Sequence, residues 1–120
     1  MSRLDEIKLK SAKALKIQQL KDEFAEMSEA PVMYNGVEWH GGDNSARKLA
    51  DKAKLLEYAG ETSGDIFDTS DIYHTLTIAE MEAVAFAIAL DYETKLASYK
   101  QAKSAVLAAT TLQEVESVTI

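Results

Sequence analysis

Two histidines in different surroundings are the residues whose side chains are best suited to catalysis or ligand binding. His40 opens the segment His40-Gly41-Gly42-Asp43, a loop that could present a base or a ligand, although a lone histidine beside glycines is usually a turn residue. His74 stands in a strand-like pattern, and the chain has no cysteine to share a metal with it. Two histidines without a positioned carboxylate do not make a zinc site, so we expect no metal here.

Three aspartates, Asp65, Asp68 and Asp71, are spaced by three residues. A calcium loop needs oxygen ligands at alternate positions, a central glycine and a late glutamate, and these are missing, so we predict turn-forming aspartates. The sequence also lacks the glycine-rich phosphate and dinucleotide loops and the nucleophile elbow. We therefore expect a non-enzymatic protein with no catalytic residue and no cofactor. An enzyme would need a pocket formed around His40 and Asp43.

Length and charge limit the classes of partner. A chain of 120 residues supports one small core, and no apolar run approaches the 18 residues of a membrane span. Between Glu57 and Glu93 there are nine acidic residues and no Lys or Arg. Nucleic acid binding requires positive charge, so we expect neither nucleic acid nor membrane as a partner. The acidic stretch is either a solvated face or a surface for a basic partner.

The stretch from Thr77 to Ala109 predicts one long helix, because it holds no Gly or Pro. Its apolar residues step alternately by three and four, the coiled-coil spacing, with Lys95 as the break. Such a helix would be roughly 48 Å long, whereas a domain of this size has a radius of gyration of about 13–14 Å. The seam serves either a monomer's core or assembly, and the length favours assembly. The predicted interface residues are Ile78, Met81, Ala85, Ile88, Tyr92, Tyr99, Ala102 and Val106.

The N-terminal segment predicts a second long helix, from a cap at Ser2 with Asp5 to the neighbourhood of Met27, before Pro31. Its apolar residues form two groups that face about 130° apart at 100° per residue. The groups are Leu4, Ile7, Ala14 and Leu15, and Ile17, Leu20, Phe24 and Met27. We therefore divide the chain into an N-terminal helix over 1–30, a possible interaction arm, and a small α+β domain over 31–120.

Two hairpins and a helix fill the middle of the chain. Asn35-Gly36 between β-prone runs predicts a hairpin with a type I′ turn. A helix capped by Asp43 or Asn44 should run to about Ala59, with Gly60 at its C-terminal cap and a loop over 61–64. A second hairpin is predicted around residues 69–71, and capping boxes at 77–80 and 111–114 should open the last two helices. The fold class is α+β and helix-rich, and the two hairpins could share one antiparallel sheet.

Three stretches carry a resemblance to a known family. They are Val37-Glu38-Trp39 followed by Asp43-Asn44-Ser45-Ala46-Arg47, then Asp71 through Leu76-Thr77 into Glu80, and a tail with Lys103, Val106, Ala108, Ala109, Thr111, Glu114, Val115 and Ile120. Over residues 34–120 the chain resembles a small domain of unknown function that recurs in bacteriophage tail-fibre and tail-fibre-assembly-type proteins. Many relatives carry a Trp in the second hairpin, where this chain has Phe67 or Tyr73.

The resemblance implies a place in the phage particle or its assembly and transfers no catalytic residue. We expect a virion structural protein of the tail or tail-fibre attachment region, acting as an adaptor and present in the host cytoplasm during assembly. Such a domain usually ends a longer chain, whereas here it stands nearly alone, so we expect a small adaptor rather than a receptor-reading fibre shaft. The alternative is a tail-fibre assembly chaperone that acts in the host cytoplasm and is absent from the mature particle. The three-fold symmetry of tail fibres favours a homotrimer, with docking to other phage tail or fibre proteins as the alternative.

Overall fold

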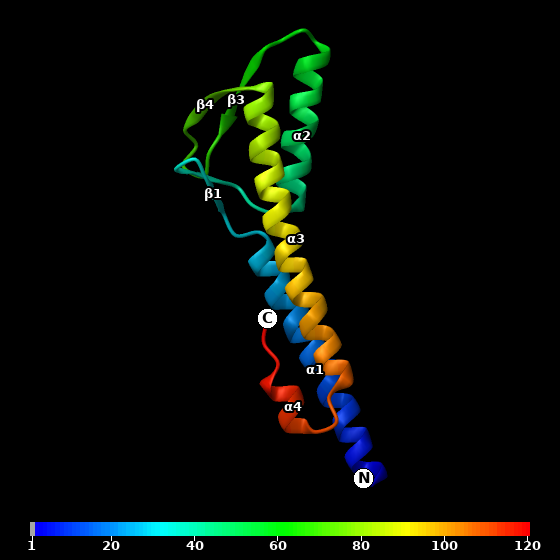
Figure 1. Ribbon diagram of the computed structural model, residues 1–120. Helices are drawn as coiled ribbons and strands as arrows, with labels where there is room; N and C mark the ends of the chain where they lie inside the picture. The colour runs from blue at the N-terminus through cyan, green and yellow to red at the C-terminus, as the bar shows by residue number, and fades with distance from the viewer. Residues whose placement is uncertain (1) are drawn as a thin grey trace. The chain divides into compact units, whose positions relative to one another are not determined.

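The computed structural model describes residues 2–120 as a helix-rich α+β fold, as the sequence predicted (Figure 1). Its elements are α1 (Arg3–Ser28), β1 (Val32–Tyr34), β2 (Val37–Trp39), α2 (Asp43–Tyr58), β3 (Ser63–Phe67), β4 (Tyr73–Thr77), α3 (Ile78–Ala108) and α4 (Leu112–Ser117). The four helices hold 26, 16, 31 and 6 residues, so helix accounts for well over half of the chain. The packing forms two compact units, residues 2–27 with 95–120, and residues 28–94. They do not follow the division at residue 30 that the sequence suggested.

The first unit packs α1 against the C-terminal half of α3 and against α4. Its core consists of Leu20, Ala102, Val106, Ala109 and Val115. Phe24 stacks on Tyr99 with ring centroids 5.3 Å apart. Lysine ammonium groups add polar ties, since Lys13 Nζ donates to the Leu107 carbonyl at 2.9 Å and Lys95 Nζ donates to the Met27 carbonyl at 2.8 Å. Residues 2–27 are therefore an integral part of this unit.

The two apolar groups of α1 have different surroundings. In the later group Leu20 is buried and Ile17 is half-buried against the core of the first unit. In the earlier group Leu4, Ile7 and Leu15 are 60%, 54% and 63% exposed. The prediction of two faces on one helix is confirmed, and the earlier face is open to solvent.

The hairpins of the second unit follow from local turn chemistry. Asn35 and Gly36 have φ values of 51° and 75°, and two successive positive φ values are the requirement of a type I′ turn. Strands β3 and β4 pair from Ser63 with Thr77 to Phe67 with Tyr73, so β3 begins inside the segment predicted as a loop.

The prediction of one shared sheet is wrong, because each hairpin is a separate two-stranded sheet. Their backbones meet at one point, where Thr69 N–H donates to the Glu38 carbonyl at 3.1 Å. Thr69 lies in the turn after β3, where the backbone has already left the extended conformation, so the pairing does not continue.

Helix α2 ends as predicted but begins differently. Its N-cap is Gly42, with a φ of 98° and no side-chain hydrogen bond, and Asp43 is its first helical residue. At the C-terminus Gly60 N–H donates to the Glu57 carbonyl and Glu61 N–H donates to the Leu56 carbonyl. This is the Schellman pattern, with Gly60 in the left-handed conformation at a φ of 78°.

The core of the second unit is formed by α2 and the N-terminal half of α3, with the hairpins packed against them. Its buried residues are Trp39, Ala46, Leu49, Ala53, Met81, Val84, Ala85 and Ile88. A Cβ atom on Gly64 would lie 2.5 Å from Leu56 Cδ1, so the absence of a side chain lets β3 approach the helices. The predicted box that opens α3 is present, with Glu80 N–H donating to Thr77 Oγ1 and Thr77 N–H donating to Glu80 Oε1.

The N-terminus of α4 differs slightly from its prediction. Thr111 Oγ1 accepts from Glu114 N–H at 3.1 Å, whereas the Glu114 carboxylate accepts from the backbone N–H of Thr110 rather than from that of Thr111.

Within residues 2–120, none of the helices combines the length and apolar character needed to cross a membrane.

Candidate functional site

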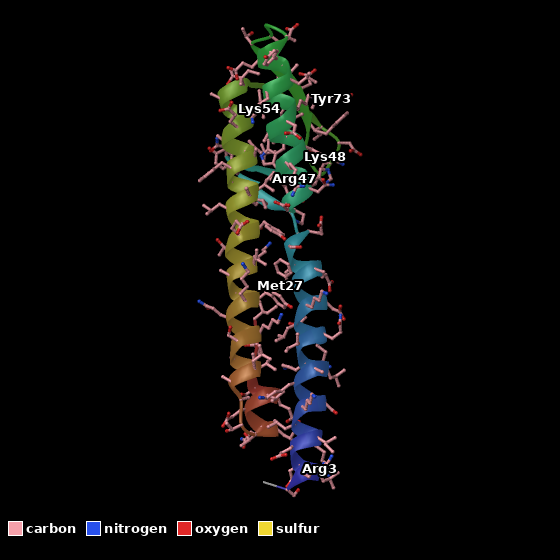
Figure 2. All side chains as sticks on the ribbon, turned by 90° about the vertical axis from the view of Figure 1, so that its right-hand side faces the viewer. Arg3, Met27, Arg47, Lys48, Lys54 and Tyr73 are labelled. Carbon is pink, nitrogen blue, oxygen red and sulfur yellow. The ribbon has the colours of Figure 1, made fainter. Side chains whose placement is uncertain are left out.

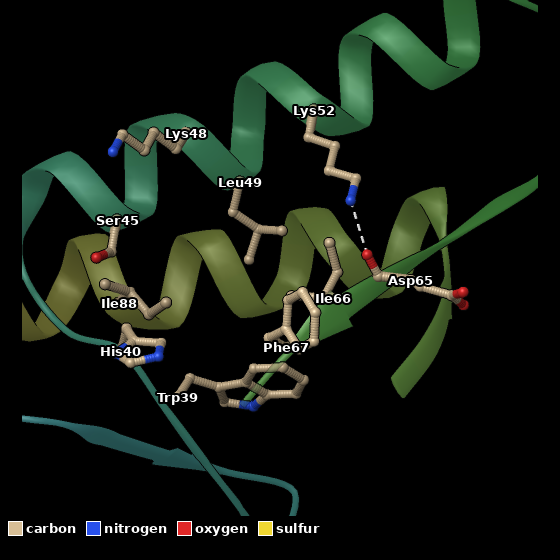
Figure 3. A pocket seen from close by; sticks show the side chains of 10 residues that line it. All are labelled: Trp39, His40, Ser45, Lys48, Leu49, Lys52, Asp65, Ile66, Phe67 and Ile88. Carbon is tan, nitrogen blue, oxygen red and sulfur yellow. Dashed lines mark hydrogen bonds between the residues drawn. The ribbon is translucent and has the colours of Figure 1, made fainter. Parts of the chain in front are cut away.

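The second unit contains a pocket of about 290 Å³ beside α2 (Figure 3). Its lining comes from four parts of the unit: α2, β3, α3 and the end of β2 with the residue after it. The lining residues are Trp39, His40, Ser45, Lys48, Leu49, Lys52, Asp65, Ile66, Phe67 and Ile88. Residues that are far apart in the sequence therefore form one concave surface.

The floor of this pocket is apolar and is formed by core residues. Trp39, Leu49 and Ile88 belong to the core of the second unit, and Trp39 is only 3% exposed. These side chains are therefore close-packed on the side away from the pocket. Such a surface favours an apolar group of a ligand or partner.

The rim of the pocket is basic and polar. Lys48 and Lys52 are one helical turn apart on α2. Ser45 lies one turn before Leu49, and both side chains point to the pocket side of α2 (Figure 3). Lys52 Nζ donates to the backbone carbonyl of Asp65 at 2.7 Å, which holds the ammonium group at the mouth. The Asp65 carboxylate points away from the pocket, and its Oδ1 atom accepts from Thr75 Oγ1 at 2.7 Å.

A hydrogen-bonded turn supports the pocket from behind Trp39. Asp68 Oδ1 accepts from the N–H groups of Ser70 and Ile72, and His74 Nε2 donates to Asp68 Oδ2 at 2.8 Å. The hydrogen bond from His74, and then that from Ile72 N–H, hold the pKa of Asp68 below its usual value. The His74 ring meets the Trp39 ring edge to face, with centroids 5.2 Å apart.

Asp68 is thus a turn-forming aspartate, which confirms that part of the prediction. Among residues 2–120 no group of three or more His, Asp or Glu side chains is arranged to hold a metal ion.

The structure separates the two residues that an enzymatic site would have required to be together. His40 lines the pocket beside α2, whereas Asp43 lines a different hollow between α2 and α3 and forms an ion pair with Arg47. The sequence reasoning did not single out Lys48 and Lys52. The sequence does show that Lys48 and Lys52 are four residues apart and would lie on one face of a helix beside Leu49. It does not show that β3 lies opposite that face.

Seven of the eight predicted interface residues on α3, all except Tyr92, pack in or against the chain's own cores. Met81, Ala85 and Ile88 are buried in the second unit, Ala102 and Val106 are buried in the first, and Ile78, Tyr92 and Tyr99 are half-buried. The long seam therefore fills the core of each unit in turn. A second copy could not contact the five buried side chains without opening these cores, and self-assembly stays a prediction.

A family model described as "Domain of unknown function (DUF4376)" matches residues 11–119. The chain belongs to this family. The match covers both hairpins, α2, α3, α4 and most of α1, so it extends N-terminally beyond residue 34, where the resemblance read from the sequence began. No curated protein and no solved structure matches the chain.

Proposed function

We propose that this protein is a non-enzymatic structural protein of the bacteriophage virion, an adaptor of the tail or tail-fibre attachment region. The phage context comes from the resemblance of the hairpin, Leu-Thr-x-x-Glu and C-terminal stretches to domains of tail-fibre and tail-fibre-assembly-type proteins. Membership of the DUF4376 family assigns neither an activity nor a place in a phage particle, so the phage context rests on the resemblance alone. An adaptor holds other proteins by surface contacts, so it needs docking surfaces rather than reactive groups.

The observation that carries the proposal is that each unit presents a surface suited to protein contact. In the first unit, the exposed face of α1 contains Leu4, Ile7 and Leu15. In the second unit, the pocket beside α2 has an apolar floor and a basic rim. Apolar residues gathered on one exposed face are typical of protein interaction sites.

Assembly into a homotrimer remains part of the proposal, with docking to another tail protein as the alternative. The α3 seam is occupied by the chain's own cores, so the exposed face of α1 is the better candidate for contact between chains. Leu4, Ile7 and Ala14 recur at helical spacing on that face, as a helix–helix contact requires.

The alternative function is a tail-fibre assembly chaperone that acts in the host cytoplasm. Both functions predict that a phage with a stop codon early in this gene produces tails without attached fibres. Particles that keep a full set of fibres and remain infectious would contradict both. Presence of the chain in purified particles distinguishes the adaptor from the chaperone.

A further inference from the structure

The pocket beside α2 is a local basic site on an otherwise acidic unit. Residues 28–94 contain four basic side chains: Arg47, Lys48, Lys52 and Lys54. Lys48 and Lys52 line the pocket, whereas Arg47 is paired with Asp43. Half of the basic residues of this unit therefore lie at one concave surface.

The rim retains capacity for an anionic group. Lys52 uses one of its three N–H donors on the Asp65 carbonyl, and neither Lys48 nor Lys52 forms an ion pair within residues 2–120. The nearest lining acid, Asp65, turns its carboxylate away from the pocket (Figure 3). At physiological salt the screening length is about 8 Å, so acids of the unit beyond that distance contribute little at the pocket. Asp51 lies one turn after Lys48 on α2 but forms no ion pair with it within residues 2–120.

The size of the pocket favours a side chain over a whole cofactor. Its volume of about 290 Å³ lies at the lower limit of roughly 300 Å³ for small-molecule sites. An aromatic or large aliphatic side chain would cover Leu49 and Ile88 while its backbone stayed at the mouth. Buried anchors of this kind dominate the energetics of many protein interfaces.

Exposed aromatic surface continues from the pocket onto the second hairpin. Phe67, which lines the pocket, is 45% exposed and packs against Tyr73 with ring centroids 3.9 Å apart. Ile72 and Tyr73 are also largely exposed. A small ligand confined to the pocket would leave this surface in water, whereas a polypeptide could run across it.

We propose that the pocket binds an acidic segment of a partner protein. An aromatic or large aliphatic side chain of that segment enters between Leu49 and Phe67, and flanking carboxylates meet Lys48 and Lys52. This inference rests on the proposed adaptor function and specifies the partner chemistry of one of its two surfaces. A failure here would leave the presence of the chain in virions unaffected, so the two proposals fail separately.

The test uses the full chain and its single tryptophan, Trp39, which lies in the pocket floor. The probe is a capped eight-residue peptide with one Phe flanked by two Asp in an otherwise Gly/Ser sequence. We expect a saturable change in Trp39 fluorescence with a dissociation constant on the order of 100 µM, typical of a short flexible segment. Replacing the peptide's Phe by Ala, or both Asp by Asn, should weaken binding by about tenfold or more.

Two lysine variants provide a matched pair. Lys48→Glu reverses a charge on the pocket rim and should weaken binding by about tenfold, whereas Lys54→Glu should change it less than about twofold. Lys48 and Lys54 are both exposed on α2 (Figure 2). At 100° per residue Lys54 lies about 200° around the helix from Lys52, and it does not line the pocket. Circular dichroism would verify that both variants keep their helix content.

Three results would overturn the inference. One is the absence of a fluorescence change up to millimolar peptide. The second is equal weakening by Lys48→Glu and Lys54→Glu, which would indicate non-specific attraction. The third is binding of phenylacetate as tightly as the peptide, which would make this a small-molecule site.

Discussion

Ile88→Ala tests most sharply whether the α3 seam is core or interface. Ile88 is 2% exposed and lies in the core of the second unit with Trp39 and Leu49. The change removes three carbon groups, each worth about 0.8 kcal/mol of transfer free energy, or roughly 2.4 kcal/mol. The cavity left between two helices adds to this, so we expect a loss of about 3–4 kcal/mol in the free energy of unfolding.

Phe86→Ala is the control on the same helix. Phe86 is 68% exposed, so the loss there should stay below about 1 kcal/mol although more carbon atoms are removed. Urea unfolding followed by Trp39 fluorescence reports on the core that contains Ile88. The measurement is made at two protein concentrations about a hundredfold apart, because stability that depends on an interface rises with concentration.

The core assignment predicts a loss for Ile88→Ala that is the same at both concentrations. A loss below about 1 kcal/mol would refute the packing argument. So would a wild-type midpoint that rises with concentration while the midpoint of Ile88→Ala does not, because that pattern would place Ile88 in a contact between chains.

Three further predictions concern a helix end, a turn and the exposed face of α1. Gly60→Ala should lower the free energy of unfolding by about 1 kcal/mol in urea, because Gly60 has a φ of 78°, which strains a residue with a side chain. An added Cβ would have no neighbour within 4 Å, so no clash adds to this cost. An unchanged urea midpoint would contradict the left-handed cap. The lowered pKa of Asp68 means that its ionised form stabilises the fold above the usual aspartate pKa of about 3.9 and that this stability is lost as the pH falls through the lowered value. Asp68→Asn should therefore flatten the decline in melting temperature between about pH 5 and pH 2, and an unchanged slope would count against the turn's hydrogen bonds. Ile7→Ser combined with Leu15→Ser should abolish any self-association seen by light scattering with little change in melting temperature, and a large loss of stability would show that this face is buried.

Local signals in the sequence were sufficient to predict much of the fold. The Asn35-Gly36 turn, the Thr77–Glu80 box and the Gly60 cap each depend on residues within a few positions of one another. Steric preferences and short-range hydrogen bonds determine such features without knowledge of the tertiary structure. The two apolar faces of α1 were also predictable, because helical geometry alone separates them.

Features that depend on long-range packing could not be predicted in the same way. The α3 seam has a coiled-coil spacing, but spacing does not state whether the facing partner is the same chain or another. Here α1, α2 and α4 supply that partner within the two units. The pocket could not be predicted from the sequence either, because Lys48 and Phe67 line the same pocket only when the second hairpin packs beside α2.

Quantitative mass spectrometry of purified phage particles tests the adaptor proposal most directly. Particles are separated from free protein by density gradient, and peptides of this chain are measured against those of the tail proteins. The adaptor function predicts the chain in every preparation at a fixed stoichiometric ratio to the tail. Its absence from particles, together with its presence in the infected-cell lysate, would contradict the adaptor and indicate the assembly chaperone.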